Sequence, residues 1–206
     1  PLRHPPGDDA IRNAAATVGT GCATERADIH AGAVMHELGH TLGLHHGGPK
    51  DIEPGACQHV INRKPNYLSV MNYAFSSGLV TIRDQRRFDY SRFDSAVIGD
   101  LNERSLSEQN GITVFGQPPV DCMSNSYWPT CYKTKWKCTN VFRPVGPNLD
   151  WNCRNGVEAG LRPVDISGLP HDTVEIYDNL KTYNDWDNID YKGGLPGGNV
   201  LLQDTF

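Results

Sequence analysis

The segment HELGHTLGLHH, from His36 to His46, decides how the rest of the chain is interpreted. His36 and His40 are four residues apart, so on an α-helix their side chains project from one face, ~40° apart and one turn along the axis. Two imidazoles placed in this way can bind one zinc ion at ~2.0–2.1 Å each. Glu37 is the next residue round the helix, and its carboxylate can reach a water on the metal without being a ligand itself.

A third zinc ligand is available in His46, which follows His36 by ten residues. In an unbroken helix that separation is ~15 Å along the axis, too far for one ion. The helix must therefore end before His46, which Gly43 permits because glycine adopts a positive φ without steric cost. His36, His40 and His46 then form a three-histidine site with an open fourth position, as is typical of catalytic zinc. The neighbouring His45 is expected at the surface or behind the ligands.

Helical periodicity extends over residues 28–46. The apolar positions of this segment form a stripe roughly opposite His36, which predicts a helix with a metal-binding front and a back that packs in the core. The stripe comprises Ala31, Val34, Leu38 and Leu42.

The rest of the chain has few signals of regular structure, since it contains 21 Gly and 14 Pro residues. We expect an irregular lead-in over residues 1–27 and a loop over 47–66. Residues 67–75 form a compact apolar segment between turn formers. A capping-box pattern predicts a short helix over 100–111.

Composition excludes several classes of protein. The net charge of −5 provides no basic patch for nucleic acid, and no apolar run approaches the ~18 residues of a membrane span. A length of 206 residues fits a single domain over 1–206. Six cysteines without a CxxC pair favour disulfides over a zinc ribbon, and hence a secreted protein. Because the chain begins at Pro1 rather than Met, we expect an N-terminal segment or pro-segment to be missing.

The extended histidine motif resembles the zinc signature of the metzincin metallopeptidases. These proteins also have a methionine turn beneath the metal, and in Ser69-Val70-Met71-Asn72-Tyr73 the methionine stands 25 residues after His46. With PNYLSVMNY, FDYSR and LNE, the resemblance to secreted microbial metzincins covers roughly residues 28–111. Gly47 follows the third histidine, and it is none of the residues that mark matrixins, adamalysins, astacins or serralysins, so the branch is not assigned.

The resemblance implies an α+β fold, with a metzincin-like zincin catalytic domain and a loop-rich C-terminal subdomain over residues 112–206. The active-site helix and zinc signature would occupy 28–46, and the Met-turn 67–75. Metzincins normally place a twisted sheet before the active-site helix, whereas 35 residues precede His36 here. The N-terminal sheet is therefore expected to be truncated or missing.

The resemblance also implies a zinc-dependent endopeptidase, which hydrolyses protein or peptide substrates by attack of a zinc-bound water. Glu37 would be the general base, and Met71 would support the site from below. Tyr73 would either approach the metal and the oxyanion or pack in the core. Two alternatives are a non-catalytic zinc-containing extracellular binding module derived from a peptidase, and an extracellular interaction domain with a structural zinc. The presence of Glu37 argues against both, because neither needs a general base.

The region 150–190 has nine acidic and three basic residues. Within it, residues 150–156 (DWNCRNG) resemble a calcium loop, with oxygen side chains at alternate positions before a glycine. Asp185, Asp187 and Asp190 add further oxygen donors. A bound Ca²⁺ and an ordinary solvated acidic surface both explain this composition, and both stay open.

Overall fold

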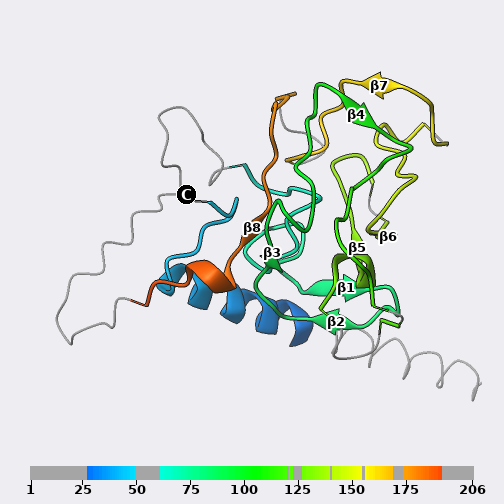
Figure 1. Ribbon diagram of the computed structural model, residues 1–206. Coiled ribbons are helices and arrows are strands. Elements are labelled where there is room, and N and C mark those ends of the chain that lie inside the picture. The colour runs from blue at the N-terminus through cyan, green and yellow to red at the C-terminus, as the bar shows by residue number, and fades with distance from the viewer. Residues whose placement is uncertain are drawn as a thin grey trace, which may run out of the picture.

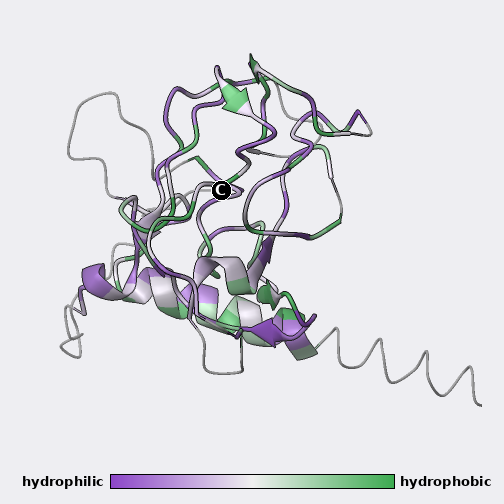
Figure 2. Cartoon of the chain, turned by 45° about the vertical axis from the view of Figure 1, so that its right-hand side comes forward, coloured by the Kyte–Doolittle hydropathy of each residue, from purple (hydrophilic) through white to green (hydrophobic). Residues whose placement is uncertain are grey.

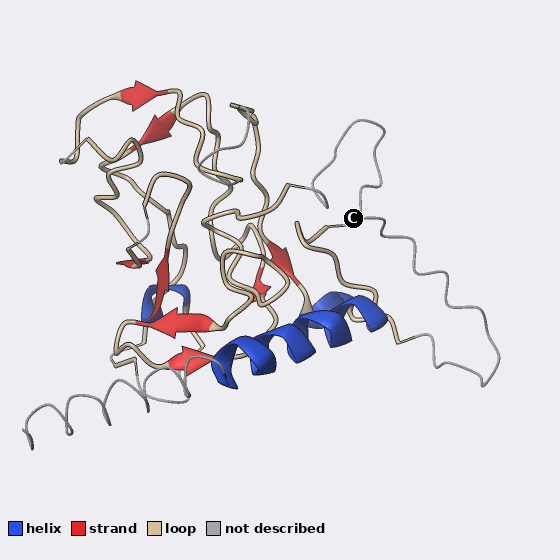
Figure 3. Cartoon of the chain, turned by 180° about the vertical axis from the view of Figure 1, so that it is seen from behind, coloured by secondary structure: helices blue, strands red, loops and turns tan. Residues whose placement is uncertain are grey.

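The computed structural model describes residues 27–49, 61–119, 121–122, 127–139, 141–154, 156–168 and 174–191. A helix over residues 27–41 lies along one side of a body of short strands and long loops (Figures 1 and 3). Within these residues, no helix has both the length and the apolarity needed to cross a membrane. The lead-in expected over residues 1–27 lies outside the described ranges, except for its last residue. The expected N-terminal sheet would also precede the described residues.

The strands are short and all their pairings are antiparallel. The largest sheet among the described residues has four strands in the order β2-β1-β5-β6, and two further sheets pair β3 with β8 and β4 with β7. The β4–β7 pair lies at the end of the molecule away from the helix (Figure 1). The bounds are β1 Leu79–Thr81, β2 Arg86–Arg87, β3 Arg92–Phe93, β4 Leu106–Ser107, β5 Tyr132–Thr134, β6 Arg143–Pro144, β7 Leu161–Arg162 and β8 Tyr183–Asn184, with 3₁₀ turns η1 Pro129–Cys131 and η2 Trp186–Asn188.

The described residues thus contain both helix and antiparallel sheet. The metzincin-like arrangement of these elements stays a prediction. The described part of residues 112–206 has only strands of two or three residues and two 3₁₀ turns, so it is rich in loops. Its buried side chains, such as Trp151 and Ile166, join a large core with Phe75 and Leu68. A smaller apolar cluster lies beneath the helix and contains Leu44, Tyr67, Val70, Met71 and Tyr90.

Buried carboxylates stabilise the loops that lie outside the hydrogen-bonded strand pairs. The side chain of Glu103 is fully buried, and its oxygens accept hydrogen bonds from the backbone N–H groups of Ile166, Ser167 and Tyr177 at 2.8–2.9 Å. Glu108, also buried, accepts two further backbone N–H groups. Because buried backbone donors need acceptors, these carboxylates replace the hydrogen bonds that longer strands would supply.

The prediction of a short helix over residues 100–111 is wrong. These residues form turns and the strand β4. Glu103, which the capping-box pattern assigned to the first turn of that helix, instead accepts hydrogen bonds from residues more than sixty positions away. The pattern was present, but tertiary contacts decided the role of this carboxylate.

The prediction that the helix buries its apolar stripe is wrong for three of the four residues, since Ala31, Val34 and Leu38 are exposed and only Leu42 packs against the cluster beneath the helix. Val34 is 68% exposed and Leu38 is 47% exposed, and the helix presents both hydrophobic and hydrophilic positions along its length (Figure 2). The helix instead packs through Gly32, His36 and Gly39, which are buried and share one face.

Close backbone approach explains the two glycines on that face. A Cβ atom added at Gly32 would lie 1.9 Å from the carbonyl oxygen of Ser76, and one added at Gly39 would lie 2.2 Å from Sδ of Met71. A side chain at Gly32 would displace the helix from the Ser76 backbone, and one at Gly39 would require the Met71 thioether or the helix to move. The helix therefore rests directly on residues 71–76.

Disulfides are present, as the cysteine pattern predicted. Cys122 is bonded to Cys131, and Cys138 to Cys153. The remaining two, Cys22 and Cys57, lie outside the described residues. Both observed bonds are in the C-terminal part, whose described residues are rich in loops.

Candidate metal centre

Three imidazoles converge at the C-terminal end of the helix. Nε2 of His40 lies 3.2 Å from Nε2 of His36 and 2.9 Å from Nε2 of His46. In a tetrahedral site with metal–nitrogen bonds of ~2.0–2.1 Å, two ligand nitrogens are separated by ~3.3–3.4 Å. The observed spacing is therefore close to what one ion needs. Among the described residues, no other group of three His, Cys, Asp or Glu side chains is close enough to bind a metal.

The second nitrogen of two of these rings is anchored on the backbone. Nδ1 of His36 lies 2.9 Å from the carbonyl oxygen of Val70, and Nδ1 of His40 lies 3.0 Å from that of Leu44. A carbonyl only accepts, so Nδ1 carries the proton and donates it. The Nε2 lone pairs are then directed into the centre, as in metal-binding histidines generally.

Burial favours the metal-binding form of His36. The side chain is 4% exposed, and desolvation lowers the pKa of His36, against the smaller opposing effects of the Val70 hydrogen bond and the Glu37 charge. The imidazole is thus kept neutral, which is the form that binds a metal. Neutral imidazole donors suit zinc among the metals common in proteins.

Gly43 ends the helix as predicted. Its φ is +80°, its N–H donates to the carbonyl oxygen of His40, and the N–H of Leu44 donates to that of Gly39, both at 3.0 Å. These two bonds around a left-handed residue form a Schellman motif. The turn directs the chain back so that His46 reaches the other two histidines.

A buried lysine holds the loop that follows His46. Lys64 is fully buried, and its ammonium donates to the carbonyl oxygen of Gly47 at 2.6 Å and to that of Lys181 at 3.2 Å. It therefore fixes the backbone next to His46. No pattern in the sequence indicated this role, because the lysine lies in a segment interpreted only as loop.

Met71 lies beneath the helix, in the position expected of a supporting residue. Its side chain is fully buried, and it meets the helix at Gly39, which lies between His36 and His40. The position of the helix is also fixed by the hydroxyl of Tyr90, which donates to the carbonyl oxygen of Met35 at 2.7 Å.

Tyr73 lies at the edge of the centre. Its ring centroid is 5.1 Å from that of His36, nearly parallel to it, and 4.4 Å from that of His46. The side chain is 43% exposed, so the alternative that Tyr73 is a core residue does not hold. A partly exposed tyrosine beside this histidine cluster can contact a bound substrate.

Glu37 is exposed on the helix beside His36. Its carboxylate is close enough for its charge to favour the protonated form of that histidine. Among the described residues, it has no hydrogen-bond or ion-pair partner, so the carboxylate is available to a ligand. His45 is half-buried and pairs with Gly48 through the backbone, outside the triad.

Asp185 is a site-supporting residue whose role sequence reasoning missed. The sequence grouped it with the acidic C-terminal residues, yet it is fully buried. Its carboxylate accepts hydrogen bonds from the hydroxyls of Tyr67 and Ser69 at 2.6 and 2.5 Å and from the N–H of Ser91 at 2.9 Å. It thereby ties the end of the chain's described part to the turn that contains Met71. Burial raises the pKa of Asp185 to about 7.

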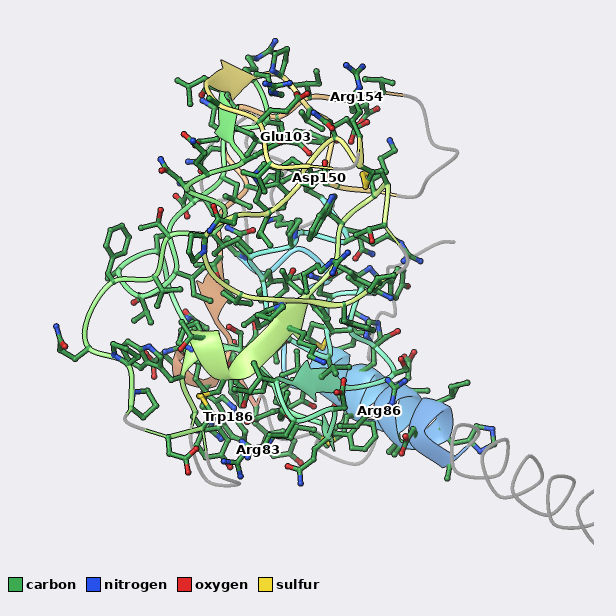
Figure 4. All side chains as sticks on the ribbon, turned by 90° about the vertical axis from the view of Figure 1, so that its right-hand side faces the viewer. Arg83, Arg86, Glu103, Asp150, Arg154 and Trp186 are labelled. Atoms are coloured by element: carbon green, nitrogen blue, oxygen red, sulfur yellow. A yellow bond between two sulfur atoms is a disulfide. The ribbon has the colours of Figure 1, made fainter. Side chains whose placement is uncertain are left out.

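The calcium hypothesis gains no support from the contacts in the described part of 150–190. The carboxylate of Asp150 accepts the backbone N–H groups of Arg154 and Gly156 within its own turn; Figure 4 shows Asp150 and Arg154 far from the helix. Asp165 is paired with Lys137 at 2.6 Å. These oxygens already have partners inside the protein.

Comparison with known proteins adds no assignment. No protein-family model, no curated protein and no solved structure matches the chain.

Proposed function

We propose that this chain is a zinc-dependent endopeptidase of the metzincin clan, secreted from the cell, which hydrolyses peptide bonds of protein substrates. One observation supports this above the others: three Nε2 atoms converge, with two of the rings held on backbone carbonyls. A purely structural helix has no need of that arrangement. The two disulfides fit an oxidising compartment.

His36, His40 and His46 would bind the zinc ion. A bound zinc ion supplies Lewis acidity, which polarises a carbonyl and lowers the pKa of water. Glu37 takes the proton from the attacking water and delivers it to the leaving amine, which is the general acid–base part of the reaction. The Tyr73 hydroxyl donates a hydrogen bond to the carbonyl oxygen as negative charge develops on it.

The test combines metal analysis with a single isosteric variant. After dialysis, elemental analysis of the wild-type protein should find about one equivalent of zinc per chain, and ortho-phenanthroline should abolish casein hydrolysis. Glu37→Gln should keep the zinc and the melting temperature but lower kcat by ~10²–10⁴. Glu175→Gln, a matched change of an exposed glutamate outside the centre, is the control and should leave kcat unchanged.

Two outcomes would contradict the proposal. Hydrolysis that persists after complete removal of zinc would exclude the mechanism. Stoichiometric zinc without turnover in the wild-type protein would instead favour the non-catalytic binding module.

A further inference from the structure

A small cationic pocket lies beside the candidate metal centre. Its volume is about 60 Å³, which is room for a carboxylate group or one or two waters. Three basic side chains, those of Arg63, Lys135 and Lys137, line it together with uncharged residues that include Ala74 and Trp136.

One hydrogen-bonded residue joins this pocket to the metal centre. Oδ1 of Asn62 accepts the backbone N–H of Arg63 at 2.8 Å and that of Tyr73 at 3.0 Å. The pocket wall at Arg63 and Ala74 therefore begins directly beside Tyr73. Because the Tyr73 ring lies against two of the three histidine rings, the pocket wall and the histidine centre adjoin the same residue.

Two of the three basic side chains in the pocket have no acidic partner. Lys137 is paired with Asp165 at 2.6 Å. By contrast, Arg63 and Lys135 form no ion pair with any carboxylate in the part of the chain that the structure describes. The Lys135 ammonium lies 5.0 Å from the Phe142 ring, and this contact does not neutralise its charge.

The electrostatics of this cluster are unfavourable without a ligand. Burial, and after it the charges of Arg63 and Arg86, lower the pKa of Lys135. Arg86, which lies by the helix (Figure 4), is itself paired with Asp28 at 3.3 Å. Two uncompensated cations held side by side in a partly buried position destabilise a fold unless an anion joins them.

Trp136, which also lines this pocket, has a buried donor without a partner. The side chain is 6% exposed, and its Nε1 has no hydrogen-bond partner. A buried N–H without an acceptor costs stability. An anion in the pocket would give the two cations the partner that the described part of the chain does not supply.

We propose that the Arg63–Lys135 pocket binds a carboxylate of the substrate, so that the enzyme prefers peptides with a negative charge close to the scissile bond. The inference rests on the proposed peptidase function and specifies its substrate class. The carboxylate has two sources, an acidic side chain or the C-terminus of a short peptide, and these are separated by experiment.

The test uses matched peptides that differ only in charge. One series replaces Glu by Gln at each position on either side of the cleaved bond, and a second compares a free C-terminal acid with its amide. The value of kcat/KM is measured for the zinc-loaded wild-type protein. Binding of the same peptides is measured by fluorescence anisotropy with the Glu37→Gln variant, so that affinity is read without cleavage.

We expect the carboxylate peptide of one pair to be preferred about ten- to a hundredfold, as for a charge-assisted hydrogen bond in a partly buried site. Lys135→Met and Arg63→Gln should each remove most of that preference. Arg83→Gln is the control, because Arg83 is exposed, is paired with Asp121 and does not line the pocket. Lys135→Met should not lower the melting temperature, since it relieves repulsion between like charges, and this distinguishes lost recognition from misfolding.

The outcomes separate the two proposals. If the wild-type protein cleaves peptides but neither series shows a charge preference, the pocket inference is overturned and the peptidase proposal stands. A preference that survives in both variants also overturns it. If no peptide is cleaved, the peptidase proposal fails, and the binding series alone decides whether the pocket takes a carboxylate.

Discussion

The Tyr73 hydroxyl is expected to act in the transition state rather than in substrate binding. Its ring lies against two histidines and is partly exposed, so the hydroxyl can meet an oxyanion that exists only during the reaction. Tyr73→Phe should therefore lower kcat by about tenfold with little change in KM. Steady-state kinetics on one peptide would measure both, and zinc content is the control. Unchanged kcat would leave Tyr73 as a packing residue.

Individual site residues differ in how well the sequence predicts them. The three converging histidines and Gly43 lie within eleven residues, so helix geometry and glycine stereochemistry were enough to predict their arrangement. Lys64 and Asp185 support the same site through contacts with residues far away in sequence, Lys181 and Tyr67 among them. Nothing in a local pattern distinguishes such residues from an ordinary loop lysine or a surface aspartate.

The helix can contact Met71 closely because residue 39 is a glycine and has no side chain. An alanine at Gly39 would place Cβ 2.2 Å from Sδ of Met71. Gly→Ala in a helix normally stabilises by ~1 kcal/mol, yet here overpacking should lower the free energy of unfolding by ~1–3 kcal/mol. Urea unfolding would measure this change. In a Met71→Ala background the same substitution should cost less, and an equal cost in both backgrounds would contradict the proposed clash.

The helix was predicted, but the face that it buries was not. Hydrophobic periodicity assigns the core to the apolar stripe, and Val34 and Leu38 are nevertheless exposed. The buried face has Gly32 and Gly39, which contribute little to an apolar pattern because they have no side chain. Two glycines seven residues apart on the histidine face were the available signal, since they mark a place where another segment approaches closely.

For the molecule as a whole, short strands make buried carboxylates important for stability. Glu103 accepts three backbone N–H groups from two distant segments. In Glu103→Gln, an amide N–H₂ replaces one acceptor oxygen and leaves at least one of these donors without a partner, at ~1–3 kcal/mol. Thermal unfolding should show a clearly lower midpoint, whereas Glu175→Gln, at an exposed position, should not. Equal midpoints would show that the loops do not depend on Glu103.

The pH dependence of stability should reveal the buried Asp185 carboxyl. Its pKa is raised by burial to about 7 in the folded protein, against ~3.9 in an unfolded chain. Below ~3.9 both states are protonated and the contribution is fully present. Between ~3.9 and about 7 the unfolded state releases its proton first, so the folded state binds more protons and its stability falls as pH rises.

Asp185→Asn, which mimics the protonated carboxyl, should remove this slope. Urea unfolding of both proteins from pH 4 to pH 8 without metal would show a difference in unfolding free energy that changes with pH, by up to ~4 kcal/mol. Burial also raises the pKa of Glu103 and lowers that of His36, so these groups add their own pH dependence to stability. This dependence is the same in the wild-type protein and in Asp185→Asn, so only the difference in unfolding free energy between the two proteins reports on Asp185. Parallel curves would mean that the Asp185 carboxyl is ionised throughout and that its three hydrogen bonds outweigh desolvation.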